Sequence, residues 1–417
     1  MFKQKLAMVL ALIGMMLLAA CDAGGTPPAA TQVVGTAQQA ATEVATNVPD
    51  ATQVAQGVNE AATEVAGGVN EAATQIATVT GSERMKVAFV YVGPIGDGGW
   101  TWAHDQGRLA LEKNLNVETS YQESVPENAA DAERVIRDFA QKGNKVIFTT
   151  SFGYMDPTIN VAKDFPNTVF IHISGYKTAA NVGTGFGKIE EPRYVSGLIA
   201  GKMTKTNQLG YVAAFPIPEV IRGINAFTLG VRKSNPSARV KVVWTNTWFD
   251  PQKERAAGES LLDGGADVIA QHQDTPGPQQ AAEARGMYGV GYNSDMSKFA
   301  PKAVLTSPIW NWGIYYTQIV KAVQNRTWKS DQYWGGWKEG VVDLAPFGPM
   351  VPDDVKKMAD DEIARFKSGQ QTIFTIFTGP LKDQTGAERV PAGQSLSADD
   401  LLSKMDWFVE GVDGSPK

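Results

Sequence analysis

From residue 85 onward, apolar positions change between a strand-like and a helical pattern. Residues 85–92 are mostly β-branched or aromatic and have few polar positions on either face, which is typical of a parallel strand covered by helices on both sides. A glycine-rich turn follows, and leucine and alanine then recur at helical spacing up to Leu115. Such stretches keep alternating along the chain, which predicts an α/β fold with doubly wound parallel sheets.

The stretches fall into two sets, which predict two sheets in series. The first set has strands at residues 85–92, 145–152 and 168–174 and a helix at 130–142. The glycine-spaced segment 181–188 has no good core face, and we interpret it as the first crossover. The second set has strands at 209–215, 240–247, 267–272 and 288–292 and helices at 190–203, 219–233, 252–262 and 279–285. Two sheets of similar pattern imply two lobes with a cleft between them.

Each expected lobe is built from two separate parts of the chain. The first lobe takes residues 85–184 and 304–330, and the second takes residues 185–303 and 331–380. We expect the chain to return to the first lobe at 304–310 and to cross again near 333–338. Three crossing segments make a multi-strand hinge, so the lobes are expected to close by rotation. Residues 381–417 are expected to pack on the hinge as a C-terminal tail.

The first 21 residues have the layout of a secretory signal. Two lysines precede an apolar core that is too short to span a bilayer comfortably, and small residues then precede Cys21. The pattern predicts a bacterial lipoprotein signal peptide, residues 1–21. Cys21 is then lipid-modified and anchors the chain to the cell membrane on its extracytoplasmic side. An ordinary signal with a chance cysteine is the alternative.

Residues 22–84 differ from the rest in composition. They are rich in Ala, Thr, Gln, Val and Gly and contain no aromatic residue, so they have little apolar surface to bury. Short motifs that begin at Ala51, Ala62 and Ala73 are spaced by eleven residues, close to three helical turns. We interpret the segment as a low-complexity tether, and a coiled-coil oligomerisation segment is the alternative.

Composition narrows the classes of function. The formal net charge is −6 and no basic tract is present, which argues against a nucleic-acid partner. A single cysteine excludes intramolecular disulfides and cysteine-ligated zinc sites. The three histidines lie in three different elements, and the common hydrolase, metalloprotease and P-loop motifs are absent. We therefore expect binding without turnover, with no cofactor and no metal. The loop acids are spread over both lobes, whereas a calcium-dependent nucleoside hydrolase needs several converging aspartates.

Three motifs together carry a resemblance to a known family. They are GPIGDGGWTWAHDQG at residues 93–107, GTGFGKIEEPRYVSGLIAGKM at 183–203 and KDQTGAERVPAG at 382–393. From about residue 85 to the C-terminus, the chain resembles the basic membrane protein family of substrate-binding lipoproteins, the PnrA-like group. The resemblance implies a type I periplasmic-binding-protein fold that serves an ABC importer through its permease and ATPase. Purine nucleosides or nucleobases are the usual ligands of this family.

Aromatic side chains in the first-lobe loops are the expected stacking surfaces, because purine rings bind well between aromatic faces. Trp100 and Trp102 lie in the glycine-rich loop. No helix or strand period requires an aromatic residue at Trp100. Trp102 begins a helix, and the alternative for it is packing over the end of the sheet without contact to a ligand. Phe152 and Tyr154 follow the second strand, where the family also places an aromatic residue. Packing between the lobes is the alternative for both.

Two further aromatic candidates come from other parts of the chain. Phe215 ends a strand of the second lobe, so we expect the purine to lie between Trp100 and an opposing ring such as Phe215. Trp310 lies at the second crossing and is a weaker candidate, because helical spacing through Tyr316 indicates that this stripe is mostly core. A tryptophan in the first loop, where the family usually has phenylalanine, favours a flat nucleobase.

Polar candidates occupy the same loops. They are Asp97, His104, Glu219, Arg222, Asn225, Asp250, Gln273, Asp274, Asn293 and Asp295. Asp97 matches the acid of the family's first loop, although many relatives carry an adjacent pair. The resemblance suggests Asp295 as the acid for a ribose or an amine, with a helix N-cap as the alternative. His104 is expected either to donate to a ring nitrogen or to cap the loop. Glu219 and Arg222, one helical turn apart, are expected either to contact the ligand or to pair with each other.

These observations predict a monomeric, membrane-anchored substrate-binding component of an ABC importer. A purine nucleobase or nucleoside is captured by closure of the two lobes, and the permease recognises the closed form. One alternative is a ligand-sensing lipoprotein that feeds a receptor kinase. Another is a binding protein for a different small polar solute such as a sugar.

Overall fold

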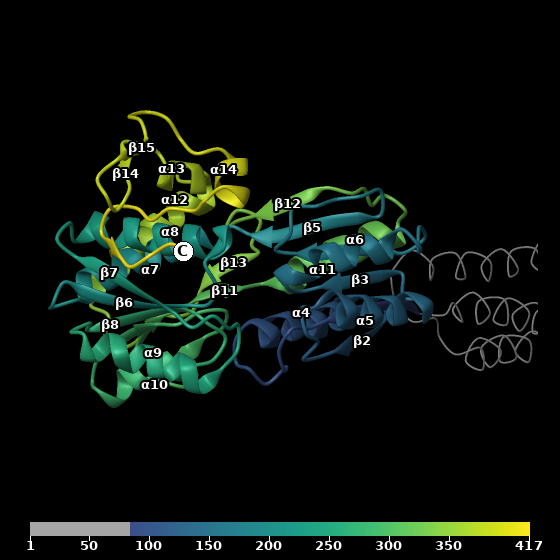
Figure 1. Cartoon of the computed structure of the whole chain (residues 1–417), viewed down its shortest axis with the longest axis horizontal. Helices are drawn as coiled ribbons and strands as arrows, with labels where there is room; N and C mark the ends of the chain where they lie inside the picture. The colour runs from purple at the N-terminus through teal and green to yellow at the C-terminus, as the bar shows by residue number, and fades with distance from the viewer. Residues whose placement is uncertain (1–83) are drawn as a thin grey trace, which may run out of the picture. The chain divides into compact units, whose positions relative to one another are not determined.

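Two parallel sheets of six strands form the frame of the structure, a computed structural model that describes residues 84–417 (Figure 1). The first sheet has the order β12-β5-β4-β3-β1-β2. Its strands are β1 (Met85–Val90), β2 (Val117–Gln122), β3 (Val146–Thr149), β4 (Val169–Ile173), β5 (Val182–Gly187) and β12 (Gln332–Gly335). The second sheet has the order β10-β9-β8-β6-β7-β16. Its strands are β6 (Gln208–Ala213), β7 (Arg239–Trp244), β8 (Val268–His272), β9 (Tyr288–Val290), β10 (Val304–Thr306) and β16 (Val412–Asp413).

Helices cover both faces of the first sheet. The helices α4 (Trp100–Asn114) and α11 (Trp312–Gln324) pack against each other, and α5 (Ala129–Gln141) packs against α6 (Met155–Ala162). In β1, Val87 and Phe89 join the core that contains α4 and α11, whereas Ala88 and Val90 join the core that contains α5 and α6. Successive side chains of a strand point to opposite faces, so the nearly continuous apolar sequence of β1 fills both cores.

The second sheet is also covered on both sides. The helices α7 (Glu190–Met203), α8 (Pro218–Ser234) and α12 (Asp353–Ser368) form one layer, and α9 (Pro251–Asp263) and α10 (Gly277–Ala284) form the other. The helices α7 and α8 cross in close contact. A Cβ atom on Gly197 would overlap the backbone oxygen of Phe227, and one on Gly230 would overlap that of Tyr194. Only glycine at these two positions allows the two backbones to approach so closely.

A small two-stranded sheet lies between the lobes (Figure 1). The strand β11 (Pro308–Trp310) pairs antiparallel with β13 (Val342–Leu344). With the link from β5 to α7, these segments make three crossings between the lobes, which agrees with the expected hinge. Among residues 84–417, no helix is long and apolar enough to cross a membrane.

Two expectations for the first sheet were wrong. The strand β2 was not predicted, because it is a mostly exposed edge strand with the mixed polar sequence VETSYQ. Segment 181–188, expected to be the first crossover, contains the fully buried strand β5. Its glycines hid the pattern, since they replace apolar side chains where rings pack directly on the backbone. A Cβ on Gly185 would overlap Tyr315, and one on Gly187 would overlap Trp310.

The crossing points also differ from the expected ones. The strand β10, expected to begin the return to the first lobe, is the edge strand of the second sheet, and the return follows at β11 and α11. The strand β12, expected in the second lobe, pairs with β5 in the first. Both strands are short edge strands, and their partners are far away in the sequence, so local pattern does not assign them to a sheet.

The C-terminal tail, residues 381–417, was expected to pack on the hinge, but it packs on the second lobe. It follows α13 (Ile373–Ile376) and contains β14 (Leu381–Lys382), β15 (Glu388–Val390), α14 (Ala398–Ser403) and β16. The strand β16 adds to the edge of the second sheet beside β7, and α14 contacts α8. Asn225 holds the tail, because its amide donates to the carbonyl of Trp407 at 2.9 Å and its side-chain oxygen accepts from the backbone N–H of Val409 at 3.0 Å. The expected signal peptide, the lipidated Cys21 and the tether lie outside the described residues, apart from residue 84.

Candidate functional site

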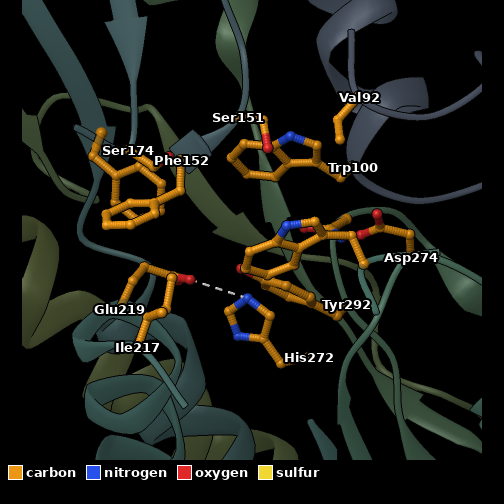
Figure 2. A pocket seen from close by; sticks show the side chains of 13 residues that line it. Val92, Trp100, Ser151, Phe152, Ser174, Ile217, Glu219, His272, Asp274 and Tyr292 are labelled. Carbon is orange, nitrogen blue, oxygen red and sulfur yellow. Dashed lines mark hydrogen bonds and ion pairs between the residues drawn. The ribbon is translucent and has the colours of Figure 1, made fainter. Parts of the chain in front are cut away.

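A cavity between the two lobes holds about 410 Å³ of space between atoms, part of which is open to solvent (Figure 2). The first lobe contributes Val92, Trp100, Ser151, Phe152, Ser174 and Phe186. The second lobe contributes Ile217, Glu219, Trp248, His272, Asp274, Tyr292 and Asn293. Most of these residues stand at or just after the carboxyl end of a parallel strand, where α/β sheets place their ligands.

Trp100 presents a fixed aromatic surface on the first-lobe side. Its indole Nε1 donates to the carbonyl oxygen of Thr150 at 2.7 Å. Its ring stands nearly perpendicular to the indoles of Trp310 and Trp312, with centroids 5.6 and 5.8 Å away. Because a hydrogen bond and two edge contacts already hold the ring, it needs little ordering when a flat ligand stacks on it. Phe152 lies nearby in the 3₁₀ turn that follows β3 (Figure 2).

Trp248 and Tyr292 provide the aromatic surface of the second lobe. Phe215, which we expected to face the ligand, does not line the cavity. It packs edge-on against Trp248, with centroids 4.9 Å apart and an interplanar angle of 63°. The expected opposing aromatic ring is thus supplied by the loop after β7 rather than by the loop after β6.

Two acidic side chains line the cavity with different surroundings. Glu219 faces His272, with 3.1 Å between a carboxylate oxygen and Nε2 of the imidazole. Asp274 accepts a hydrogen bond from the amide of Asn293 at 3.1 Å. Burial raises the pKa of Asp274 well above its ordinary value, and the carboxyl groups of Asp97 and Glu254 add to this rise. Asp274 therefore keeps a proton at a higher pH than a free aspartate does, and a protonated carboxyl can donate as well as accept.

The two lobes touch each other around the cavity. The indole N–H of Trp248 donates to the carboxylate of Glu127 in the first lobe at 2.9 Å. The hydroxyl of Ser294 in the second lobe donates to the carbonyl of Gly98 in the first. Lys298 of the second lobe lies 5.7 Å from the ring centroid of Trp102 in the first lobe. These contacts describe a closed arrangement of the lobes, with the cavity between them.

Five of the expected site residues line this cavity: Trp100, Phe152, Glu219, Asp274 and Asn293. Three of the expected acids cap helices instead. Asp97 accepts from the backbone N–H groups of Gly99, Thr101 and Trp102 at 2.8–2.9 Å. Burial raises the pKa of Asp97 to about 6, against the lowering effect of these three bonds. Asp250 caps α9, and Asp295 caps the 3₁₀ turn Met296–Lys298, the alternative named for Asp295.

Three further candidates belong to the interior of the protein. Tyr154 is fully buried, and its hydroxyl donates to the carbonyl of Val125. His104 is fully buried between Tyr316 and Trp312, whose ring centroid lies 4.6 Å from its own. Burial lowers the pKa of His104 well below its ordinary value, so it stays neutral at physiological pH. Trp310 stacks on Trp312 and donates its indole N–H to the side-chain oxygen of Asn293 at 2.8 Å.

The remaining candidates stand behind the cavity lining or at its rim. Arg222 forms a buried ion pair with Glu190 at 2.5 Å rather than with Glu219. The amide of Gln273 donates to the hydroxyl of Thr245. Trp102 lies at the contact between the lobes, near Lys298.

Sequence reasoning missed eight lining residues: Val92, Ser151, Ser174, Phe186, Ile217, Trp248, His272 and Tyr292. Most of them lie at the end of a predicted strand or within two residues after it, so a uniform search of these positions finds them. Trp248, for example, directly follows the predicted strand 240–247. Phe186 escapes that search because segment 181–188 was interpreted as a crossover and not as a strand. Among residues 84–417, no group of three or more histidine, cysteine or acidic side chains is placed to hold a metal ion.

The chain matches one family model and is similar in sequence to known proteins. The family model of PnrA-like ABC transporter substrate-binding proteins matches residues 84–376. A purine-binding protein of Brucella abortus (strain 2308) is 50% identical over 333 residues, which cover 79% of this chain and 93% of that protein. A putative ABC transporter glucose-binding protein of Haloferax volcanii is 43% identical over 333 residues, which cover 80% of this chain and 81% of that protein.

A solved structure shows the same fold. The solute-binding protein of an ABC transporter system from Conexibacter woesei DSM 14684 superposes with a TM-score of 0.57. It has 23% sequence identity, and the match covers 69% of this chain and 98% of that one.

Proposed function

Because the chain belongs to the PnrA-like family of ABC transporter substrate-binding proteins, we propose that it captures a purine nucleobase or nucleoside between its two lobes. The closed form then delivers this ligand to an ABC permease and its ATPase. Its similarity to the purine-binding protein of Brucella abortus supports this choice of ligand. The observation that carries the proposal is the aromatic lining of the cavity, to which both lobes contribute.

Capture follows from how the cavity is divided between the lobes. Trp100 and Phe152 come from the first lobe, and Trp248 and Tyr292 come from the second. A flat ring system that enters from the open side gains stacking area on one lobe before closure and on the other lobe only after it. The ligand therefore binds the closed state more tightly than the open state, and this difference drives the closure.

The polar groups of the cavity suit the edge of a nitrogen heterocycle. Ser151, Asp274 and Asn293 come from three different loops and Glu219 from the first turn of α8, and together they offer both donors and acceptors. A purine carries ring nitrogens that accept and N–H groups that donate, all in one plane. Polar groups at the edge and aromatic rings on the faces match this distribution.

The first test is a calorimetric titration with adenine, adenosine, guanosine, inosine and glucose. We expect binding heat and quenching of tryptophan fluorescence with at least one purine, because Trp100 and Trp248 both line the cavity. Glucose is included because the Haloferax volcanii relative is named as a putative glucose-binding protein. Binding heat with glucose and none with any purine would contradict the purine assignment and indicate a sugar-binding role.

We also propose that the chain is a lipoprotein held at the outer side of the cell membrane through Cys21. Small residues precede the single cysteine at the end of a short apolar segment, which supports the proposal. A labelled palmitate analogue is expected to enter the wild-type protein during expression in a bacterial host and not the Cys21→Ala variant. Equal labelling of both proteins would remove the anchor from the proposal.

A further inference from the structure

A buried guanidinium behind the cavity determines where one histidine carries its proton. The Nη2 atom of Arg193 lies 3.1 Å from Nδ1 of His272, and its Nη1 atom donates to the carbonyl of Gln271 at 3.1 Å. A guanidinium has donors only, so Nδ1 of His272 must accept and carries no hydrogen. The proton of the neutral imidazole is then on Nε2, which faces Glu219 at 3.1 Å (Figure 2).

The surroundings leave Arg193 in this one position. It is 1% exposed, and its guanidinium lies over the ring of Tyr292, 3.8 Å from the centroid. Gly223 of α8 leaves the room for it, since a Cβ there would lie 3.0 Å from Nε of Arg193. Arg193 thus contacts two cavity residues, His272 and Tyr292, without lining the cavity itself.

Glu219 receives the proton of His272 on one oxygen only. Its other oxygen, Oε1, is buried and has no hydrogen-bond partner among residues 84–417. Burial acts to raise the pKa of Glu219, but His272 and the guanidiniums of Arg222 and Arg193 outweigh it and lower the pKa. Burial lowers the pKa of His272, so the imidazole stays neutral. Glu219 is then an ionised side chain that accepts hydrogen bonds and lines the cavity, and one of its two oxygens has no donor.

We infer that Arg193 is a positioning residue that determines ligand selection: it holds His272 as the Nε2–H tautomer and leaves Oε1 of Glu219 free for an N–H or O–H donor of the ligand. An analogue that presents a lone pair or a methyl group to Oε1 leaves a buried carboxylate oxygen unpaired, which is unfavourable. The inference rests on the proposed function only for the choice of purines as probes.

The tautomer is measured directly by ¹⁵N NMR of protein labelled at histidine. The chain has three histidines, and the signals of His272 are assigned by their loss in His272→Gln. We expect a neutral imidazole with the proton on Nε2 in the wild type and in Arg193→Lys, which keeps a donor. In Arg193→Met, Nδ1 loses its donor and the nearby positive charge, while Nε2–H still donates to Glu219. Protonation of Nδ1 is then no longer opposed, so the imidazolium of His272 is expected to form at a higher pH than in the wild type. An imidazolium or an Nδ1–H tautomer in the wild type near neutral pH would overturn the inference, and so would an unchanged pH dependence of the His272 signals in folded Arg193→Met.

Ligand selection is measured by calorimetry with adenine and two methylated analogues, 9-methyladenine and 6-dimethylaminopurine. The first analogue lacks the ring N–H of adenine, and the second lacks the N–H groups of its exocyclic amine. We expect one of the two methylated purines to bind the wild type about 10- to 100-fold more weakly than adenine, since a hydrogen bond to a charged group is lost. In Glu219→Gln, the amide oxygen accepts from His272 and the NH₂ group faces the ligand, so this preference is expected to disappear. Equal selectivity in the wild type and Glu219→Gln would contradict the inference.

The matched control is Arg239→Met, at an exposed arginine of β7 that pairs with Asp413. It is expected to change neither the NMR tautomer nor the selectivity. If adenine does not bind the wild type at all, the proposed purine ligand is wrong. The tautomer experiment still decides the role of Arg193 in that case, because it needs no ligand.

Discussion

Replacement of Trp100 by alanine is expected to weaken purine binding about 5- to 150-fold, since stacking of a base on an aromatic side chain contributes roughly 1–3 kcal/mol. The indole is held by its hydrogen bond to Thr150 and by the edges of two other indoles, so it is ready to stack before the ligand arrives. Trp100→Phe keeps an aromatic face but loses the hydrogen bond. We expect it to bind with an affinity between those of the wild type and the alanine variant.

Trp102→Ala is the matched control for this measurement. It removes the same side chain from the same first turn of α4, but Trp102 does not line the cavity and contacts Lys298 at the rim. Calorimetry with the best purine ligand compares the three variants, and a thermal unfolding midpoint close to that of the wild type shows that each is folded. Unchanged purine affinity in Trp100→Ala would remove the physical basis for the proposed ligand.

Replacement of Gly99 by alanine is expected to block closure of the lobes and to weaken ligand binding by about 100-fold or more, because the ligand then meets only the open state. Gly99 precedes α4 in the first lobe, and Asp274 follows β8 in the second. A Cβ atom on Gly99 would overlap the carbonyl oxygen of Asp274 and lie 2.7 Å from its Cα atom. The clash involves backbone atoms, so no side-chain rotation relieves it.

Gly96→Ala is the control, because a Cβ at Gly96 meets nothing within 4 Å although it lies in the same loop. Small-angle X-ray scattering with and without saturating ligand is the decisive measurement. The radius of gyration is expected to fall on ligand addition in the wild type and Gly96→Ala, and to stay constant in Gly99→Ala. The unfolding midpoint without ligand is expected to stay near that of the wild type, since the open lobes do not clash. A Gly99→Ala protein that becomes compact and binds normally would show that closure does not need this contact.

The position of the site followed from the sequence for a general physical reason. In parallel sheets the carboxyl ends of the strands gather at one edge, so residues after successive strands converge whatever their spacing in the chain. Trp100 and Asp274 were identified in this way, and both line the cavity. The motifs at residues 93–107, 183–203 and 382–393 together indicated the two-lobed fold through their resemblance to the family.

The choice between a ligand-facing and a supporting side chain did not follow from the sequence. Asp97 and Asp274 look alike as loop acids, yet one turns inward to cap α4 and the other lines the cavity. Phe215 and Trp248 are both aromatic residues beyond strand ends, and only their packing shows that the first supports the second. Such outcomes depend on rotamers and on contacts with distant segments.

The sequence by itself determined the alternation of strands and helices, the two lobes, the strand-end location of the cavity and Trp100 as one of its candidate residues, because local periodicity and turn chemistry act over a few residues. The tertiary structure alone decided that β10 and β12 belong to opposite sheets from those expected and that Trp248 lines the cavity from the second lobe. It also placed Arg193 against His272, 79 positions further along the chain. The pairing of edge strands, the contacts between closed lobes and the partners of buried charged groups all depend on segments that meet only after folding.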